Sequence, residues 1–268
     1  MQVGYNVQSV VDAKHNLIVH YEVANQKDTN QLAGLVIQTK EILGVETFTA
    51  LADKGYHQGK SLEKCHQNNI ETCVAPIEYA PAADKNKFRK EDFIYQKESD
   101  TYLCPNNQPL TTNNTEYTKK NPKGETQYTF KRYDIDTKTC AGCPLAAQCL
   151  NSGESKYRHK KHIDRNEFDD AIERNRRFVE ANKPLYRKRQ AMVEHPFGTI
   201  KRSWGAYFTL VKTIPKVAAE FGIICSVYNL RRLVTIFGVQ DLQNRLKEAC
   251  FKFFDCFPAF LARFAAFG

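Results

Sequence analysis

The stretch Phe48-Thr-Ala-Leu-Ala-Asp-Lys-Gly-Tyr56 decides the fold class. Its first five residues form a short apolar run without polar alternation, which is typical of a strand that is buried on both faces of a sheet. Asp53 follows at the carboxyl end of that strand, where α/β sheets place their ligands. The Lys-Gly-Tyr sequence after it predicts a sharp turn. Asp53 is therefore either a functional acid or an ordinary turn or helix-capping aspartate.

Patterns on both sides of this strand predict an α/β fold. The expected elements are strands at 5–12 and 17–24, a helix from Asp28 or Thr29 to about Leu43, the strand at 48–52, a helix at 60–68 and a strand at 71–75. The first two strands flank a turn-like segment and form an antiparallel hairpin. Gly44 ends the first helix, as glycine does at helix C-termini. The predicted order is β-β-α-β-α-β.

The rest of the chain changes character twice. A polar stretch at 76–155 contains two short predicted strands, at 93–95 and 128–133, and has the composition of an inserted module. A strongly charged helical region at 162–206 follows, and then an apolar segment with helical spacing that predicts a buried helix at 214–237. The expected parts are the first part of the core at 1–80, the insertion at 81–156, a basic helical part that completes the core at 157–240, and a helical tail at 241–268.

The bulk properties favour a polyanionic partner. Lysine and arginine total 39 against 30 acidic residues, which gives a net charge of +9 and a pI near 9.0. Nucleic acid is the first candidate for such a partner. No stretch approaches the ~20 apolar residues of a membrane helix, and residues 1–11 lack the features of a secretory signal. A cytoplasmic protein without a membrane partner is expected.

Four of the nine cysteines predict a metal site. Cys140-Ala-Gly-Cys143 is a Cys-x2-Cys pair, with Cys149 six residues later and Cys104 upstream. Four thiolates suit tetrahedral Zn²⁺, and a polar module of this kind needs such a ligand in order to fold. The alternative is four reduced thiols without metal. Five further cysteines are interpreted as buried small hydrophobic residues: Cys65, Cys73, Cys225, Cys250 and Cys256.

A second candidate acid lies in the stretch Val193-Glu-His-Pro-Phe-Gly-Thr-Ile-Lys201. Glu194 has apolar neighbours that place it at the edge of a buried helix face. Lys201 comes seven residues later, two helical turns on and on roughly the same face. A carboxylate for a metal beside a lysine for a phosphate suits phosphoryl transfer, whereas the alternative is a surface helix with salt bridges. Pro196 predicts a kink or a break.

Three segments, in this order, resemble the DDE-type transposases of bacterial insertion sequences: Gly4-Tyr-Asn-Val-Gln8 with Val11-Asp12 after it, Ala52-Asp-Lys-Gly-Tyr56, and Val193 to Lys201. The likeness runs nearly end to end. It implies an RNase H-like core in which three carboxylates hold two divalent cations, Mg²⁺ or Mn²⁺, that activate water and then a DNA 3′-hydroxyl for attack on phosphodiesters. It also implies a cysteine-rich insertion, double-stranded DNA partners (transposon ends and target) and a homodimer assembled on DNA.

Carried over by position, Asp53 matches the second acid of the family and Glu194 matches its glutamate. Lys201 matches a lysine that contacts DNA phosphate. The family pattern has an arginine four residues before the glutamate, but here Gln190 stands there, so a nearby arginine is the expected substitute. The expected DNA contacts are Lys201, Arg202, Arg187, Lys188 and Arg189.

The first acid of the family has two candidate sources. An RNase H-like core runs β-β-β-α-β with the first acid on the first strand, whereas only two strands are predicted before the first helix. In the family this aspartate usually lies upstream of the Gly4 to Gln8 segment. Asp12 is the nearest substitute, and the alternative for it is a hairpin-turn aspartate. The hypothesis is an N-terminally truncated transposase.

The predicted function is metal-dependent DNA cleavage and strand transfer in cut-and-paste transposition, by a copy that is truncated and weakly active or inactive. One alternative is a catalytically dead, zinc-containing DNA-binding protein derived from a transposase. Another is a nuclease of similar fold that only hydrolyses DNA. The first function and the DNA-binding alternative both predict DNA binding, but only the transposase loses a Mg²⁺- or Mn²⁺-dependent nicking activity when Asp53 or Glu194 becomes alanine.

Overall fold

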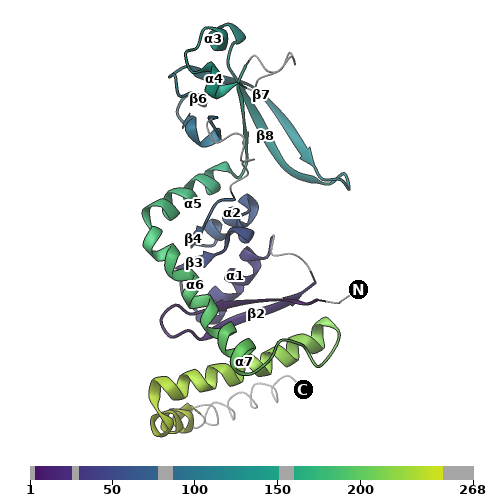
Figure 1. Ribbon diagram of the computed structural model, residues 1–268, viewed down its shortest axis with the longest axis vertical. Coiled ribbons are helices and arrows are strands. Elements are labelled where there is room, and N and C mark those ends of the chain that lie inside the picture. Colours follow the sequence, from purple (N-terminus) through teal and green to yellow (C-terminus); the bar gives the residue numbers. More distant parts are fainter. Residues whose placement is uncertain (1–3, 26–29, 78–86, 151–159, 250–268) are drawn as a thin grey trace, which may run out of the picture. The chain divides into compact units, whose positions relative to one another are not determined.

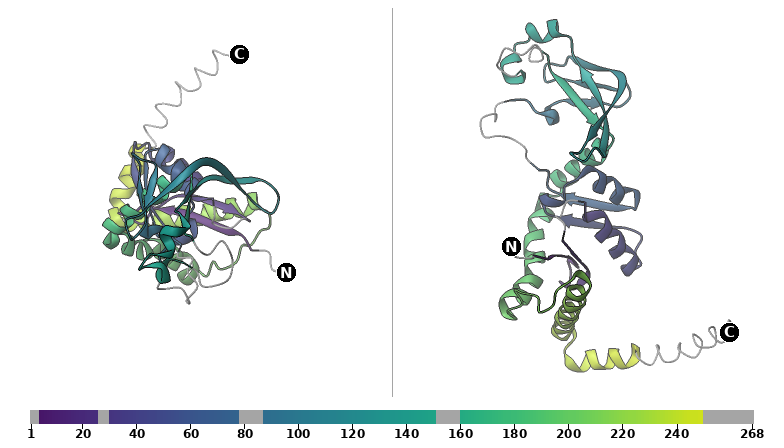
Figure 2. Two further views of the ribbon diagram at one scale, coloured as in Figure 1. Left: turned by 90° about the horizontal axis from the view of Figure 1, so that it is seen from above. Right: turned by 90° about the vertical axis from the view of Figure 1, so that its right-hand side faces the viewer.

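The computed structural model describes residues 4–25, 30–77, 87–150 and 160–249 (Figures 1 and 2). The chain divides into two compact units. The core unit consists of residues 1–75 and 178–268, and the inserted unit consists of residues 76–177. Helices and strands alternate in the first half of the core unit, so the predicted α/β class is confirmed.

The first half of the core unit has the predicted order of elements. These are β1 (Asn6–Val11), β2 (Ile18–Ala24), α1 (Leu32–Leu43), β3 (Phe48–Ala52), η1 (Lys54–Tyr56), α2 (Gly59–Gln67) and β4 (Ile70–Val74). The strand at 48–52 has the predicted bounds. Gly44 ends α1 in the left-handed region, at φ +61°, as predicted, and its N–H donates to the carbonyls of Lys40 and Glu41. The predicted caps Asp28 and Thr29 lie outside the described residues.

The strands of the core unit form two small sheets. β1 pairs antiparallel with β2, from Asn6 opposite Ala24, and β3 pairs in parallel with β4, from Phe48 opposite Ile70. Within the described ranges, neither sheet has a third strand. Helix α1 packs against β1, β2 and β3, so one helix contacts both sheets (Figure 1). The single mixed sheet of an RNase H-like core stays a prediction.

The second half of the described core unit is helical and includes α6 (Lys183–Phe197), the π-helix η4 (Gly198–Ser203) and α7 (Ile214–Phe237). Helix α7 has the predicted bounds, and its buried residues pack with Ile18 of β2 and Ile200 of η4. The predicted buried helix is buried on one face only, because Val227 and Leu230 are each 50% exposed. The regularly spaced apolar residues of α7 form one buried face, which packs against the β1–β2 hairpin.

Polar side chains of α7 hold the turn of that hairpin. Asn229 accepts a hydrogen bond from the backbone N–H of Ile18 (2.9 Å) and donates to its carbonyl (2.8 Å). The hydroxyl of Tyr228 donates to the carbonyl of Asn16 (2.9 Å), and Arg232 donates to that of His15. These bonds satisfy backbone groups that a hairpin turn otherwise leaves without partners.

The helix after α7 runs from Val239 to Ala249 and is bent by 115° from it. In the described part of the chain, no single helix meets the length and hydropathy of a membrane span, although this bent pair meets both when taken together. The tail from residue 250 onward, including Cys250 and Cys256, lies outside the described residues.

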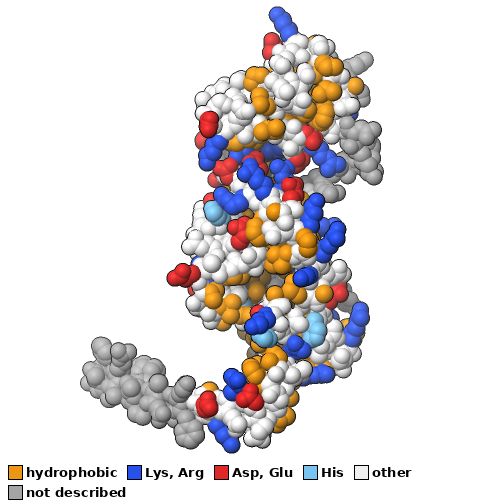
Figure 3. Space-filling model, turned by 90° about the vertical axis from the view of Figure 1, so that its left-hand side faces the viewer, with side chains coloured by type: hydrophobic (Ala, Val, Ile, Leu, Met, Phe, Trp, Pro, Cys, Tyr) orange, Lys and Arg blue, Asp and Glu red, His pale blue; other side chains and the backbone are white. Residues whose placement is uncertain are grey.

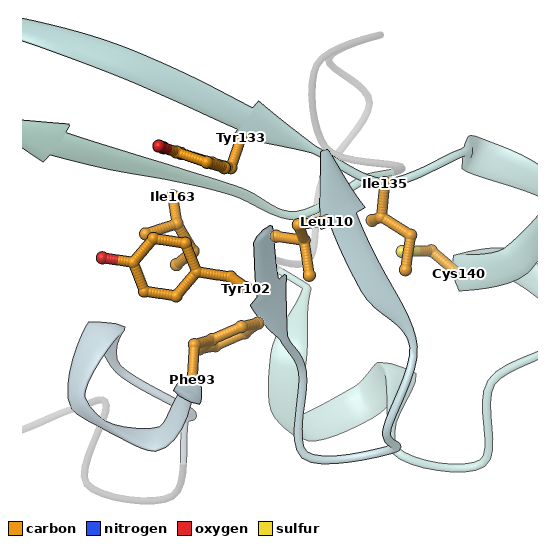
Figure 4. Packing of buried hydrophobic residues seen from close by; sticks show 7 residues of the cluster. All are labelled: Phe93, Tyr102, Leu110, Tyr133, Ile135, Cys140 and Ile163. Atoms are coloured by element: carbon orange, nitrogen blue, oxygen red, sulfur yellow. The ribbon is translucent and has the colours of Figure 1, made fainter. Parts of the chain in front are cut away.

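The inserted unit contains a five-stranded antiparallel sheet. Its strands, in order, are β5 (Ile94–Gln96), β6 (Thr101–Leu103), β7 (Pro109–Lys120), β8 (Thr126–Asp134) and β9 (His162–Asn166). The predicted strands at 93–95 and 128–133 correspond to β5 and β8. Short helices follow β8 at α3 (Thr137–Ala141) and α4 (Ala146–Cys149), and α5 (Asp169–Ala181) follows β9. The core contains Phe93, Tyr102, Leu110, Tyr133, Ile135, Cys140 and Ile163 (Figure 4).

The prediction of a helical start to the charged region is wrong at His162–Asn166, which forms strand β9. A cross-strand ion pair, whose partner lies far away in the sequence, explains the difference. Asp164 lies opposite Arg132 of β8 and accepts two hydrogen bonds from it (2.7 and 2.9 Å). Arg165 donates to Glu173 of α5 (2.9 Å) and lies 3.7 Å from the ring centroid of Tyr95. Cross-strand partners therefore outweigh the local charge pattern.

Candidate active site

Asp53 lies at the carboxyl end of β3, as predicted. Its Oδ1 accepts a hydrogen bond from the backbone N–H of Lys54 (2.7 Å) and caps the short helix η1. The side chain is 56% exposed. The capping interpretation is therefore correct for one oxygen, while the exposure of the carboxylate leaves it accessible to a ligand.

Arg189 of α6 is the charged partner of Asp53. Its Nη2 lies 3.6 Å from Oδ1 of Asp53, and its side chain is only 19% exposed. The guanidinium carbon also lies 5.4 Å from the ring centroid of Tyr186, within the range of a cation–π contact. This pair joins the end of β3 to α6, the helix that carries Glu194.

Glu194 is exposed on α6, and its Oε1 accepts a hydrogen bond from Nε2 of Gln190 (2.7 Å). Gln190 is the residue that replaces the family's arginine, so it supplies a neutral donor in place of a cation. Successive residues of an α-helix are rotated by about 100°, so Glu194 is rotated by roughly 140° from Arg189. The structure thus brings Asp53 together with Arg189, and Glu194 together with Gln190.

The end of α6 departs from a regular helix. Pro196 is buried inside α6 and lacks a backbone N–H, and α6 ends one residue later, close to the predicted break. The π-helix η4 follows and carries Lys201, whose Nζ lies 5.4 Å from the ring centroid of Phe197. The predicted spacing of two α-helical turns from Glu194 to Lys201 is therefore wrong, because π-helical turns hold more residues.

His195 links this helix end to the hairpin turn. Its Nδ1 lies 2.9 Å from the hydroxyl of Tyr228, which donates its own proton to the carbonyl of Asn16. Nδ1 of His195 is therefore the donor in the first bond, since a tyrosine hydroxyl has one proton.

Asp12 closes the same hairpin turn. Its Oδ2 accepts a hydrogen bond from the backbone N–H of His15 (2.6 Å), and its own N–H donates to the carbonyl of Leu17 (2.8 Å). These contacts agree with the interpretation of Asp12 as a hairpin-turn aspartate. Through Tyr228 of α7, the turn that carries Asp12 and the helix end that follows Glu194 are joined by hydrogen bonds.

The four cysteines of the predicted metal site line one pocket of the inserted unit: Cys104, Cys140, Cys143 and Cys149. Burial raises the pKa of Cys149, and the neighbouring thiols add to this, although the charge of Lys161 acts in the opposite direction. The backbone N–H of Gln108 donates to Sγ of Cys104 (3.3 Å). All four are free thiols. Cys65, Cys73 and Cys225 are buried as predicted.

The comparisons with known proteins give one match. Residues 103–234 match the model of a family described as the transposase DDE domain. The chain carries a transposase DDE domain. The match includes Glu194, the four cysteines and most of α7. It begins at the last residue of β6, so Asp53 lies outside it. No curated protein and no solved structure matches the chain.

DDE transposases generally use divalent metal ions, and the described residues of this DDE chain supply carboxylates of the right chemistry. Within those ranges, no three His, Cys, Asp or Glu side chains form a group with the geometry of a metal site. The carboxylates Asp53 and Glu194 instead have protein partners, Arg189 and Gln190. Carboxylate oxygens such as those of Asp53 and Glu194 suit Mg²⁺ or Mn²⁺. The way in which these acids would bind a metal ion stays a prediction.

Basic residues of the DDE domain are exposed around α6 and η4. Lys and Arg side chains occur in several places on the face shown in Figure 3. Arg187, Lys188, Lys201 and Arg202 are all exposed, as a phosphate contact requires. Arg189 differs from them, because it is mostly buried and paired with Asp53.

Arg189 was one of the predicted DNA contacts, but its pairing with Asp53 was not predicted, and only the packing of α6 on β3 reveals it. His57 gave no signal in the sequence. His57 follows η1; its Nε2 is buried and has no hydrogen-bond partner in the described part of the chain. Burial lowers the pKa of His57 from 6.5, so its neutral form is favoured.

Proposed function

We propose that this chain is the catalytic part of a transposase that cuts DNA and transfers strands, with Asp53 and Glu194 as two of its metal ligands. The observation that carries the proposal is the Asp53–Arg189 pair. It anchors the acid after β3 to the helix with the second acid, and that helix lies inside the match to the DDE domain. Bound divalent cations would activate the attacking hydroxyl and stabilise the leaving oxygen.

Arg189 connects the metal site to DNA binding. A cation at Asp53 repels the guanidinium of Arg189, and a nearby DNA phosphate attracts it. The proposed role of Arg189 is therefore to balance the charge of Asp53 in the free protein and to contact a phosphate when cation and DNA are bound. Arg187, Lys188, Lys201 and Arg202 are exposed and would neutralise further phosphates of double-stranded DNA. A homodimer assembled on that DNA is part of the proposal.

The third acid is proposed to come from a strand that is not among the described strands. Among the described strands, β1 and β3 each pair on one edge only, and α1 packs against both. A strand paired with both would join the two small sheets into one mixed sheet. Isolated two-stranded sheets are marginal, so the added strand would also stabilise the core unit. Asp12 is the alternative source of the acid within this chain.

A structural zinc ion in the inserted unit is also proposed. Its support is the convergence of Cys104, Cys140, Cys143 and Cys149 on one pocket, together with the N–H···S bond from Gln108. Four thiolates at Zn–S distances of about 2.3 Å form a closed site, which serves folding rather than catalysis. The thiols would draw together when they bind the ion.

A nicking assay tests the catalytic proposal. The purified chain is incubated with a labelled DNA duplex and Mg²⁺ or Mn²⁺. Nicking is expected to need the metal and to be lost in Asp53→Asn and in Glu194→Gln, whereas Glu46→Gln, at an exposed glutamate, keeps it. Asp12→Asn keeps nicking if the third acid lies elsewhere. Nicking that survives both Asp53→Asn and Glu194→Gln contradicts the proposal.

The same assay distinguishes the second candidate function, a DNA-binding protein that has lost catalysis. The favouring observation is that both candidate acids are engaged by Arg189 and Gln190. This candidate predicts salt-dependent duplex binding without nicking at any metal concentration.

A further inference from the structure

Strands β7 and β8 extend beyond the other strands of their sheet and form a long two-stranded ribbon of the inserted unit (Figure 1). Successive side chains of a strand point to opposite faces, so the ribbon has two different faces. Tyr133 of β8 lies in the core of the unit, opposite Ile163 of β9. Residues of the other parity, such as Arg132 and Phe130, therefore lie on the outer face.

The outer face carries a row of aromatic and basic side chains. Tyr117 lies opposite Phe130, and their rings are stacked at 24° with centroids 5.4 Å apart. Tyr128 lies next along β8, with its ring 6.3 Å from that of Phe130, and is opposite Lys119. Arg132 lies 5.6 Å from the centroid of Tyr117 and 5.9 Å from that of Phe130.

These rings do not contribute to the core of the inserted unit. The core cluster contains neither Tyr117, Tyr128 nor Phe130, and Tyr117 is 38% exposed. Arg132 donates two hydrogen bonds to the carboxylate of Asp164, and these bonds fix one end of the row. A rigid aromatic row on the solvent side of a sheet is a typical feature of an interaction surface.

The charge of the ribbon selects the kind of partner. Residues 114–132 contain five lysines and arginines against two acidic residues. Lys119, Lys120 and Lys123 are exposed near the tip. Basic side chains beside exposed rings fit unpaired nucleotides, because phosphates meet the cations while base faces stack on the rings. Bases inside a duplex are already stacked and present no free face.

We propose that the outer face of the β7–β8 ribbon binds unpaired nucleotides of DNA, with Tyr117, Tyr128 and Phe130 as the stacking platform. The inference rests on the proposed function, because cutting and joining strands produces ends with unpaired nucleotides. The platform would hold such an end, while the basic residues of α6 and η4 contact duplex DNA.

Three DNA probes test this with the full chain: a blunt duplex, the same duplex with a short unpaired 3′ tail, and a tail that contains 2-aminopurine. The tail is expected to increase affinity by about tenfold, and stacking is expected to quench 2-aminopurine fluorescence. Tyr117→Leu removes the ring and is expected to lose most of that gain. Tyr117→Phe keeps the ring and is expected to retain it.

Thr118→Leu is the matched control, because Thr118 is adjacent in β7 and points to the other face. Equal affinity for blunt and tailed duplexes overturns the inference, as does equal loss in Tyr117→Leu, Tyr117→Phe and Thr118→Leu. A Tyr117→Leu change that alters only the oligomeric state assigns the face to protein contact instead. Blunt-duplex binding and nicking report on the proposed function separately, and Tyr117→Leu is expected to leave both unchanged.

Discussion

The guanidinium of Arg189 lies 3.6 Å from the carboxylate of Asp53 and joins the end of strand β3 to helix α6. Asp53 is more than half exposed, so the pair contributes only about 0–1 kcal/mol to stability. Its importance is electrostatic, because a bound cation must compete with Arg189 for the same carboxylate. Three predictions concern the neighbourhood of this pair, and a fourth concerns the cysteine cluster.

Replacing Arg189 with glutamine is expected to tighten the binding of Mn²⁺ to the free protein several-fold, because the competing positive charge is removed. Titration of Mn²⁺, followed by its electron paramagnetic resonance signal, measures this. Arg187→Gln, at an exposed arginine of the same helix, is the control and is expected to change little. Weaker Mn²⁺ binding in Arg189→Gln would mean that the arginine organises the site instead of competing for it.

Replacing Gln190 with arginine is expected to strengthen duplex binding, because it restores the cation of the family pattern one helical turn before Glu194. One added phosphate contact raises the magnitude of the salt slope of log K by about 1. Fluorescence anisotropy over a salt series checks this, with Gln38→Arg on α1 as the control. An unchanged slope in Gln190→Arg would place this position away from the DNA.

The protein is expected to lose stability in acid partly through His57. Burial lowers its pKa in the folded chain below 6.5, so the unfolded chain binds more protons as the pH falls below that value. The contribution of His57 is therefore complete above pH 6.5 and is lost below it. Melting temperatures across this range are expected to fall less in His57→Gln than in the wild type. The exposed His66→Gln variant serves as control, and identical pH profiles for all three proteins would refute the assignment.

Purified protein is expected to contain one zinc ion per chain. Cys143→Ser removes one of four ligands and is expected to lose the metal and lower the melting temperature of the inserted unit. Cys65→Ser, in the core unit, is expected to keep the metal. Elemental analysis with thermal unfolding checks both, and a folded, reduced wild-type protein without zinc rules the site out.

Local patterns predicted much of the core unit. The strand at 48–52, the glycine that ends α1 and the bounds of α7 follow from the spacing of apolar residues and from helix-end residues. The sequence placed Asp53 at a strand end because the apolar run and the Lys-Gly-Tyr turn are adjacent. The four cysteines that line one pocket were also predictable, since metal-ligand spacing is a local signal.

Contacts between distant residues were not predictable from the chain. The charged segment His162–Asn166 resembles a solvated helix until Asp164 is placed opposite Arg132. The π-helix after Pro196 changes the spacing from Glu194 to Lys201, and regular helical periodicity does not reveal it. The pairing of Asp53 with Arg189 depends on how α6 packs on β3. No local sequence motif predicts that packing.

Metal-directed cleavage of the protein itself tests the central claim most directly. Fe²⁺ replaces Mg²⁺ in the presence of DNA, and ascorbate with peroxide then produces radicals that cut the backbone near bound iron. The account predicts cuts close to Asp53 and close to Glu194, with both lost in Asp53→Asn and in Glu194→Gln. Cuts confined to the cysteine cluster, or cuts at the two acids that persist in both variants, would contradict the claim that these acids share a metal site.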